Sequence, residues 1–493
     1  MSRWMGEARK RLMGWRRAFQ GNIKVGYAGV PATNNASGDR LAHETTPGGS
    51  FLKLPEWISS LLSHPFLRSV TLVAGGTAAA QLITIAFSPL ITRLYGPEAF
   101  GALGIFMAVV SIISPIANLT YGSAIVLPAS DSEARALFRL SALIGLSVSL
   151  LSAAGIGLFH QTIADAVGFT AASTLLLLVP LSILLSALIE PTNHWLYRRK
   201  QFKAISHITV VGAIASNGTR TVTGLFLATA PALIALGILA NALELFLLWN
   251  SARPTLSRRD TDEGVTGEPA PHVSLKEVAY RYRDFPLFRA PNDWLNVVSN
   301  SIPSLLLAAL FGPSAAGFYL LARRIVALPI TVIAGAVGTV FLPRIVEASH
   351  GGERLRPLLM KGTAGLAAVG LIPFGIMMAL GPWLFGVVFG AEWTQAGEYA
   401  RWLALWFYCA FAAVPSAQVI PILGLQGHFL AYEIAVVALR AAALAAGTVI
   451  WNSDLAAIIL FSLVGALVNL TQITWCLLSC DKRSRDQIRV SGT

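Results

Sequence analysis

Charged residues are scarce in this sequence. Only 13% of its 493 residues are Asp, Glu, Lys or Arg, whereas 55% are hydrophobic and the mean hydropathy is +0.63. Soluble domains contain roughly a quarter charged residues. So little charge, combined with long apolar runs, excludes an ordinary soluble domain and indicates that lipid is the solvent of this chain.

The sequence also lacks the signatures of several enzyme and metal-binding classes. It contains no G-x-x-x-x-G-K-[ST] loop for ATP hydrolysis and no H-E-x-x-H motif. Its three cysteines, Cys409, Cys476 and Cys480, have no second Cys or His cluster beside them, so we expect them to pack rather than to bind metal. No secretory cleavage site follows the first apolar run. We therefore expect no catalytic residues, no metal and no cofactor.

Long apolar runs fill most of the chain, and about twenty such residues cross a bilayer as a helix. By this measure the sequence predicts an all-α membrane protein with about twelve transmembrane helices. The expected spans are 66–90, 101–127, 137–158, 171–192, 205–228, 232–250, 286–311, 316–342, 359–389, 398–424, 429–450 and 455–479.

One long internal polar stretch, 251–284, divides the spans into two sets of six. We therefore predict an N-lobe at 66–250, a cytoplasmic linker at 251–284 and a C-lobe at 285–480. A basic cytoplasmic tail is expected at 1–65, either disordered or with an amphipathic helix at its start. A second cytoplasmic tail is expected at 481–493.

The distribution of positive charge predicts the topology. Lys and Arg gather in the tails, the linker and the loops after even-numbered spans, whereas Arg93 is the only such residue in the loops after odd-numbered spans. Cytoplasmic loops are the ones enriched in Lys and Arg. Both termini are therefore expected in the cytoplasm, and the net charge of +12 reflects topology rather than nucleic-acid binding.

An internal repeat supports the two-lobe arrangement. The phrase L-aromatic-G-P-x-x-x-G occurs at Leu94–Gly101 and again at Leu310–Gly317, between the first two spans of each half. A similar phrase ends the following span in each half, at Val126–Pro128 and Phe341–Pro343. An even number of helices per repeat gives both halves the same orientation, so we expect two parallel six-helix lobes around a central cavity.

Ionisable residues inside the spans are candidates for function, because they are costly in lipid and normally face a cavity or a partner. The candidates for a cationic, phosphate-binding cavity are Arg220, Arg323, Arg324, Arg401 and Arg440. Glu244 and Asp293 are candidates for coupling or ion pairing. Structural alternatives remain open: Arg220 pairs with Glu244, or Arg401 extends to the membrane surface. Glu190 and Glu433 lie near span ends, and we expect them to be solvated.

The chain resembles the Wzx-type polysaccharide flippases, within the multidrug/oligosaccharidyl-lipid/polysaccharide exporter superfamily, over about residues 66–480. The resemblance rests on Arg93–Gly101 with the following Ile116–Pro128, and on two groups of residues in the second half. These groups are Phe285-Pro286-Leu287, Pro291, Ala322-Arg323-Arg324 and Leu328-Pro329, and then Phe389-Gly390-Ala391-Glu392-Trp393 with Ala396-Gly397.

This resemblance implies a function and a location. It implies that undecaprenyl-diphosphate-linked oligosaccharide units move from the cytoplasmic to the periplasmic leaflet of the bacterial inner membrane by alternating access. It implies a proton or sodium gradient as the drive, membrane lipids as surroundings, and a polysaccharide polymerase and a chain-length regulator as partners. The polysaccharide would be lipopolysaccharide, exopolysaccharide or capsule.

Other functions remain as alternatives. A drug or cation exporter of the same superfamily should have acidic residues in the cavity of the first lobe, and the first two spans contain none. A lipid II flippase usually has two further helices. A membrane glycan polymerase should have a large periplasmic loop with catalytic residues, and no such loop is predicted. A non-transporting membrane scaffold also remains open.

Overall fold

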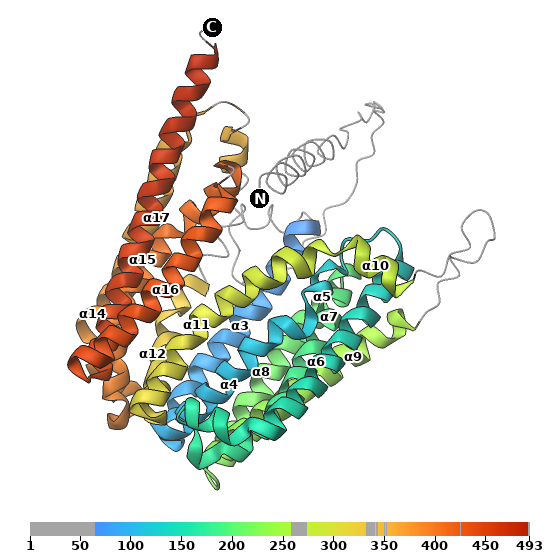
Figure 1. The fold of residues 1–493 in the computed structure, drawn as a ribbon, viewed down its shortest axis with the longest axis vertical. Coiled ribbons are helices and arrows are strands. Elements are labelled where there is room, and N and C mark those ends of the chain that lie inside the picture. The colour runs from blue at the N-terminus through green and yellow to red at the C-terminus, as the bar shows by residue number, and fades with distance from the viewer. Residues whose placement is uncertain are drawn as a thin grey trace, which may run out of the picture. The chain divides into compact units, whose positions relative to one another are not determined.

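The computed structural model of the protein describes residues 65–257, 274–331, 341, 344–349, 351, 353–423 and 425–491. Within these ranges the secondary structure is helical, without strands (Figure 1). The first half contains α3 (Pro65–Leu94), α4 (Pro97–Asn118), α5 (Tyr121–Ala124), α6 (Asp131–Ala166), α7 (Val179–Arg198), α8 (Phe202–Gly224) and α9 (Ala230–Leu256). The second half contains α10 (Leu275–Arg281), a π-helix η2 (Phe285–Arg289), α11 (Ala290–Phe311), α12 (Pro313–Val326), α14 (Leu355–Phe389), α15 (Thr394–Leu423), α16 (Gln426–Trp451) and α17 (Asp454–Ser491). Two short 3-10 helices, Thr170–Leu178 and Ala391–Trp393, precede α7 and α15.

The helices confirm an all-α membrane protein with two lobes. Ten helices of the described chain are long and apolar enough to cross a membrane. The two other expected spans correspond to α8 and α12. The first of these is a full helix that contains Lys203, His207 and Arg220, which lower its hydropathy. The second is described only in part, because residues 332–340 lie outside the described chain. The expected N-terminal tail and most of the expected linker also lie outside it.

Helices from both halves meet in the middle of the molecule. There, α4 packs against α11 and α12, and α3 contacts α14 (Figure 1). On one side α6–α9 pack with α3 and α4, and on the other α14–α17 pack with one another. The lobe boundaries predicted at 250 and 285 fall close to the end of α9 and the start of η2, and they stay a prediction.

The two repeated phrases touch each other across the lobes. Each starts a helix with proline in its first turn, where the missing N–H has no helical partner to lose. A Cβ on Gly101 would overlap the carbonyl oxygen of Pro313, and a Cβ on Gly317 would overlap the carbonyl oxygen of Pro97. The contact is therefore reciprocal, and glycine is required because backbone meets backbone. We call this part of the bundle the G-P end.

A second set of contacts at the G-P end joins α3 to the end of α14 and to the turn before α15. The Trp393 indole donates a 3.0 Å hydrogen bond to the Thr92 carbonyl, and Nη2 of Arg93 donates a 2.7 Å bond to the Val387 carbonyl. The Trp393 ring meets Phe100 edge-on at 5.1 Å between centroids. The residues around Arg93 and those around Trp393, which supported the family resemblance, thus form one inter-lobe contact.

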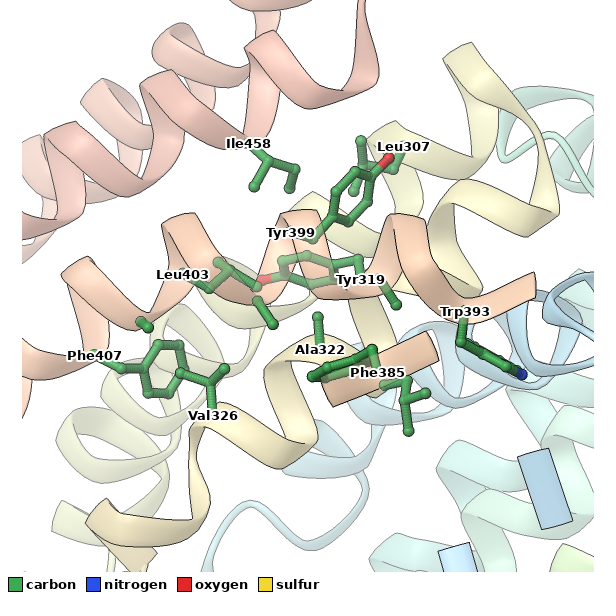
Figure 2. Packing of buried hydrophobic residues seen from close by; sticks show 14 of the residues in the cluster. Leu307, Tyr319, Ala322, Val326, Phe385, Trp393, Tyr399, Leu403, Phe407 and Ile458 are labelled. Atoms are coloured by element: carbon green, nitrogen blue, oxygen red, sulfur yellow. The ribbon is translucent and has the colours of Figure 1, made fainter. Parts of the chain in front are cut away.

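An aromatic core continues from this contact into the C-lobe. Figure 2 shows Ala322 and Val326 of α12 beside Leu403 and Phe407 of α15, with Tyr319 also buried between these helices. Burial of side chains of this size stabilises the fold by about 1.5–3 kcal/mol each when they leave water, and by dispersion where the alternative is lipid. The core fixes the rotation of α12 and therefore the direction of its polar residues.

The chain returns to the membrane through α10 and η2, which are attached to the N-lobe. The Tyr121 hydroxyl donates to the Ala279 carbonyl at 3.1 Å, and the Thr120 hydroxyl donates to the Phe285 carbonyl at 3.2 Å. Arg281 forms a 2.6 Å ion pair with Glu133 of α6. The start of the C-lobe is therefore held against α4, α5 and α6.

The reciprocal glycine contact predicts a sharp difference between two glycine substitutions. Gly101→Ala should destabilise the protein by roughly 1–3 kcal/mol, because the added methyl group meets backbone that cannot rotate away. Gly155→Ala in α6 has open space around it and should be neutral or stabilising by up to about 1 kcal/mol. Thermal unfolding of the two purified variants measures the difference, and equal midpoints would contradict the close contact.

Candidate cationic cavity

A cavity of about 640 Å³ lies where the N-lobe meets α11 and α12. Its walls come mainly from α3, α4, α7, α8 and α9, with Val297 of α11 and Leu320, Leu321 and Arg324 of α12 on the remaining side. Besides apolar side chains, it is lined by hydroxyl groups and amides. These are Thr84, Ser88, Ser111, Ser114, Ser182, Ser186, Asn217 and Asn241. The lining is therefore mainly apolar, with polar groups between the apolar side chains.

Two guanidinium groups, those of Arg220 and Arg324, are the charged groups of this lining. Arg220 projects from α8 towards α9, where its Nη2 lies 3.6 Å from the position that a Cβ on Gly237 would take. The Tyr95 hydroxyl donates to the Arg220 carbonyl at 3.1 Å, which fixes the backbone at this point. The guanidinium therefore lies beside Gly237 of α9.

Arg324 reaches the cavity from the opposite lobe. It lies within an expected span, and the protein leaves its side chain exposed at the cavity. It is close enough to Arg220 for the two positive charges to repel each other. Neither group forms an ion pair within the part of the chain that the structure describes, and no carboxylate is among the described residues of the lining. Two unneutralised guanidiniums favour an anionic ligand.

The neighbouring Arg323 points into the C-lobe instead. Its Nη2 donates a 2.9 Å bond to Oδ1 of Asn300 on α11. Arg440 of α16 lies over the Trp406 ring at 4.7 Å from the ring centroid, a cation–π geometry. Tyr319 interacts electrostatically with both arginines, and its buried hydroxyl has no hydrogen-bond partner. The five predicted arginines therefore do not share one site: two line the cavity and two flank Tyr319.

Arg401, the fifth, is elsewhere. It lies on α15 against α14, where Nη1 forms a 3.1 Å ion pair with Glu398 one turn earlier. Both side chains are partly exposed, at 38% and 29%. A pair of this kind contributes about 1 kcal/mol or less to stability. The structure gives Arg401 a local partner and does not bring it to the cavity lining.

The predicted acidic partners are also separated. Glu244 lies on α9, partly buried, and the ion pair with Arg220 that was one structural alternative is absent from the described structure. Asp293, at the start of α11, forms a 3.6 Å pair with Arg289. Neither acid neutralises the cavity arginines.

Glu190 and Glu433 are both less exposed than the sequence predicts, since both side chains are partly buried. We expected solvated side chains near span ends, but Oε2 of Glu190 accepts a 2.6 Å hydrogen bond from Nδ2 of Asn118. The signal available in the sequence was an acid inside a helix with another polar residue, Asn118, at the end of an apolar run. Their contact depends on how α4 and α7 pack, which sequence spacing does not give.

Comparison with known proteins gives the family of this fold. The model of the family described as "Polysaccharide biosynthesis protein" matches residues 90–398, more than half of the chain. The succinoglycan biosynthesis transport protein ExoT of Rhizobium meliloti is 27% identical over 336 residues, which cover 67% of this chain and 63% of the relative, less than two thirds of its length. The amylovoran biosynthesis protein AmsL of Erwinia amylovora is 24% identical over 170 residues, 34% of this chain and 40% of that protein.

Solved structures show the same fold at low sequence identity. An inward-facing multidrug resistance MATE family transporter of the MOP superfamily aligns with a TM-score of 0.64 at 15% identity, over 82% of this chain and 95% of that structure. The lipid II flippase MurJ, in an inward closed conformation, aligns with a TM-score of 0.58 at 13% identity, over 85% and 92%. The resemblance seen in the sequence is therefore confirmed: this multi-pass membrane protein has the two-lobed fold of these transporters and belongs to the polysaccharide biosynthesis protein family.

Proposed function

We propose that the protein is a flippase that moves undecaprenyl-diphosphate-linked oligosaccharide units from the cytoplasmic to the periplasmic leaflet for surface polysaccharide synthesis. The observation that supports it most is the pair Arg220 and Arg324, which line one cavity from opposite lobes with no carboxylate among the described lining residues. A diphosphate has two negative groups, and arginine binds such groups through parallel hydrogen bonds. A transporter rather than an enzyme also accords with the name of the relative ExoT.

The position of the two arginines suits alternating access. Arg220 belongs to the N-lobe and Arg324 to the C-lobe, so an anion bound by both connects the two halves that must move. The lobes are closed at the G-P end by the contacts of Gly101 and Gly317. The charge pattern supports a periplasmic position for that end. The described state would then receive its substrate from the cytoplasm, and release requires these contacts to open.

The proposal extends to the protein's surroundings. The chain would lie in the bacterial inner membrane with both termini in the cytoplasm, driven by a proton or sodium gradient. A polysaccharide polymerase and a chain-length regulator would act on the delivered units. For a drug or cation exporter, the cationic lining is unfavourable, because like charges repel a cationic substrate.

The cavity arginines predict a loss of transport that depends on charge and geometry. Arg324→Ala and Arg220→Ala should each reduce surface glycan at least about tenfold, because a charge-assisted hydrogen bond contributes roughly 1.5–3 kcal/mol. The corresponding lysine variants should restore part of the signal, since they keep the charge but lose the planar fork. Surface glycan is measured at matched membrane levels of each variant; normal glycan in both alanine variants would contradict the proposed substrate site.

Arg401 distinguishes two predictions, because the sequence assigned it to the substrate cavity and the structure pairs it with Glu398. If its function is the local pair with Glu398, Arg401→Gln should keep surface glycan near the wild-type level and cost about 1 kcal/mol or less of stability. The same glycan assay and a thermal unfolding scan measure both effects. A loss as large as that of Arg324→Ala would return Arg401 to the substrate site.

Deletion of the gene tests the function as a whole. Undecaprenyl-diphosphate-linked units should accumulate in the cytoplasmic leaflet while surface polysaccharide disappears, which leaflet-resolved analysis of lipid-linked glycans detects. Units that reach the periplasm but stay unpolymerised would indicate a polymerase. Unchanged glycans would favour the exporter.

A further inference from the structure

The expected second span is interrupted after Asn118, and the backbone there has unusual geometry. This break lies at the end of α4 away from the G-P end. After Asn118, the last residue of α4, Leu119 and Thr120 have φ of +43° and +56°, and the short helix α5 follows. Two consecutive non-glycine residues in the left-handed region cost roughly 1–2 kcal/mol each. Because α4 is itself long enough to cross a membrane, this break lies at the end of that helix. Strained backbone of this kind is found mainly at functional sites.

Three polar side chains converge on this break from three helices. Oε1 of Glu190 (α7) and Oγ of Ser141 (α6) each lie 3.5 Å from the position that a Cβ on Gly122 would take. Asn118 binds the other carboxylate oxygen of Glu190 through its Nδ2 at 2.6 Å. Gly122 thus leaves a small space, and oxygens of Glu190 and Ser141 face it.

Two of these side chains each have a buried oxygen without a hydrogen-bond partner in the described structure. Asn118 is 3% exposed and its Oδ1 accepts no hydrogen bond, whereas Ser141 is 0% exposed and its Oγ neither donates nor accepts one. An unsatisfied buried polar atom costs about 1–3 kcal/mol. The Glu190 carboxylate is partly buried; its described side-chain partner is the neutral Asn118 amide, and it forms no ion pair in the described chain.

A small cation beside Gly122 would contact Oε1 of Glu190 and Oγ of Ser141, while Asn118 holds the carboxylate in place. Carboxylate, amide and hydroxyl oxygens are the ligands that hard cations prefer. One carboxylate balances a single positive charge, whereas divalent ions normally recruit more acidic ligands, and no cluster of three or more His, Cys, Asp or Glu occurs among the residues that were described. The chemistry therefore indicates a monovalent ion that an oxygen site can hold, either a proton or Na⁺.

The charged groups around the site connect it to the C-lobe. Arg289 of η2 attracts the Glu190 carboxylate, and Asp293 of α11 repels it. His194 lies one turn further along α7 and also interacts electrostatically with Arg289. Thr120, in the break itself, is bonded to the Phe285 carbonyl at the start of η2. Neutralising Glu190 would remove its attraction for Arg289 and so weaken one link between α7 and the first helices of the C-lobe.

We propose that Glu190, Asn118 and Ser141 form a binding site for a small monovalent cation, and that its occupancy sets the attraction between α7 and Arg289. The site differs from the cationic cavity and from Glu244 and Asp293, the acids first considered for coupling. Its place as the driving-ion site rests on the proposed flippase function. Cation binding itself is independent of any glycan.

The first experiment measures Na⁺ binding by the purified full-length protein in detergent. Na⁺ should raise the midpoint of thermal unfolding when it replaces choline at constant ionic strength and pH, because a ligand of the folded state stabilises it. Glu190→Gln should abolish this rise. Glu98→Gln, a carboxylate at the opposite end of α4, is the matched control and should keep it.

Ser141→Ala separates a ligand from a structural residue. The hydroxyl has no protein partner, so its removal should leave the midpoint without Na⁺ unchanged. If Ser141 binds Na⁺, the half-saturating concentration should rise by about 3–10-fold, which corresponds to the loss of one hydrogen-bond-like contact. This variant also keeps the test decisive if Glu190→Gln does not fold.

The second experiment detects the proton. If the ion is a proton, Na⁺ should not stabilise the protein, and infrared spectroscopy should show a protonated carboxyl band that titrates with pH. This band should be absent in Glu190→Gln and shifted in Glu190→Asp. A Na⁺ response or a carboxyl band that is lost in Glu190→Gln supports the site. The absence of both, or a Na⁺ response that persists in Glu190→Gln and is unchanged in Ser141→Ala, would overturn it. Neither result depends on glycan transport, which the surface-polysaccharide assays test separately.

Discussion

The reciprocal packing of two repeated helix starts is the contact on which the rest of the structure depends. Gly101 lies against the Pro313 carbonyl and Gly317 against the Pro97 carbonyl, so α4 and α12 cross with no side chain between them. Side chains in lipid gain little from the hydrophobic effect, and close backbone approach is what holds such helices together by dispersion. Because this contact closes the lobes at one end, it determines which faces of α4 and α12 remain to line a cavity.

The packing of α12 directs the charged groups of the adjacent residues Arg323 and Arg324 into different surroundings. Its buried face, with Tyr319, Ala322 and Val326, packs into the aromatic core of the C-lobe. Arg323 consequently meets Asn300, and Arg324, one residue further round the helix, meets the N-lobe cavity that contains Arg220. Since neighbouring helical residues point about 100° apart, one Arg-Arg pair can serve two environments. The pairing of Arg220 with Arg324 thus depends on the packing of both lobes.

Most of the fold could be predicted from the sequence, because lipid imposes a simple rule: each span must be a helix of about twenty apolar residues. The repeat at Gly96-Pro97 and Gly312-Pro313 predicted two halves, although not that the two phrases touch. For the site, the residue type could be predicted and the grouping could not. Arg220 and Arg324 share a cavity while Arg401 pairs with Glu398, and the difference comes from helix rotation, which single sequence positions do not contain.

The surroundings of Glu190 also depend on helix packing, which its position in the sequence does not give. Hydropathy places it near a span end, where water would solvate it, but the early end of α4 at Asn118 brings an amide against its carboxylate. The strained turn at Leu119 and Thr120 makes this possible and also bonds to Phe285 of the other half. A local cost in backbone energy thus positions a carboxylate beside the junction of the lobes. An anionic substrate would act through the arginines, and a cation through this carboxylate, so the two ligands would influence the same junction from different sides.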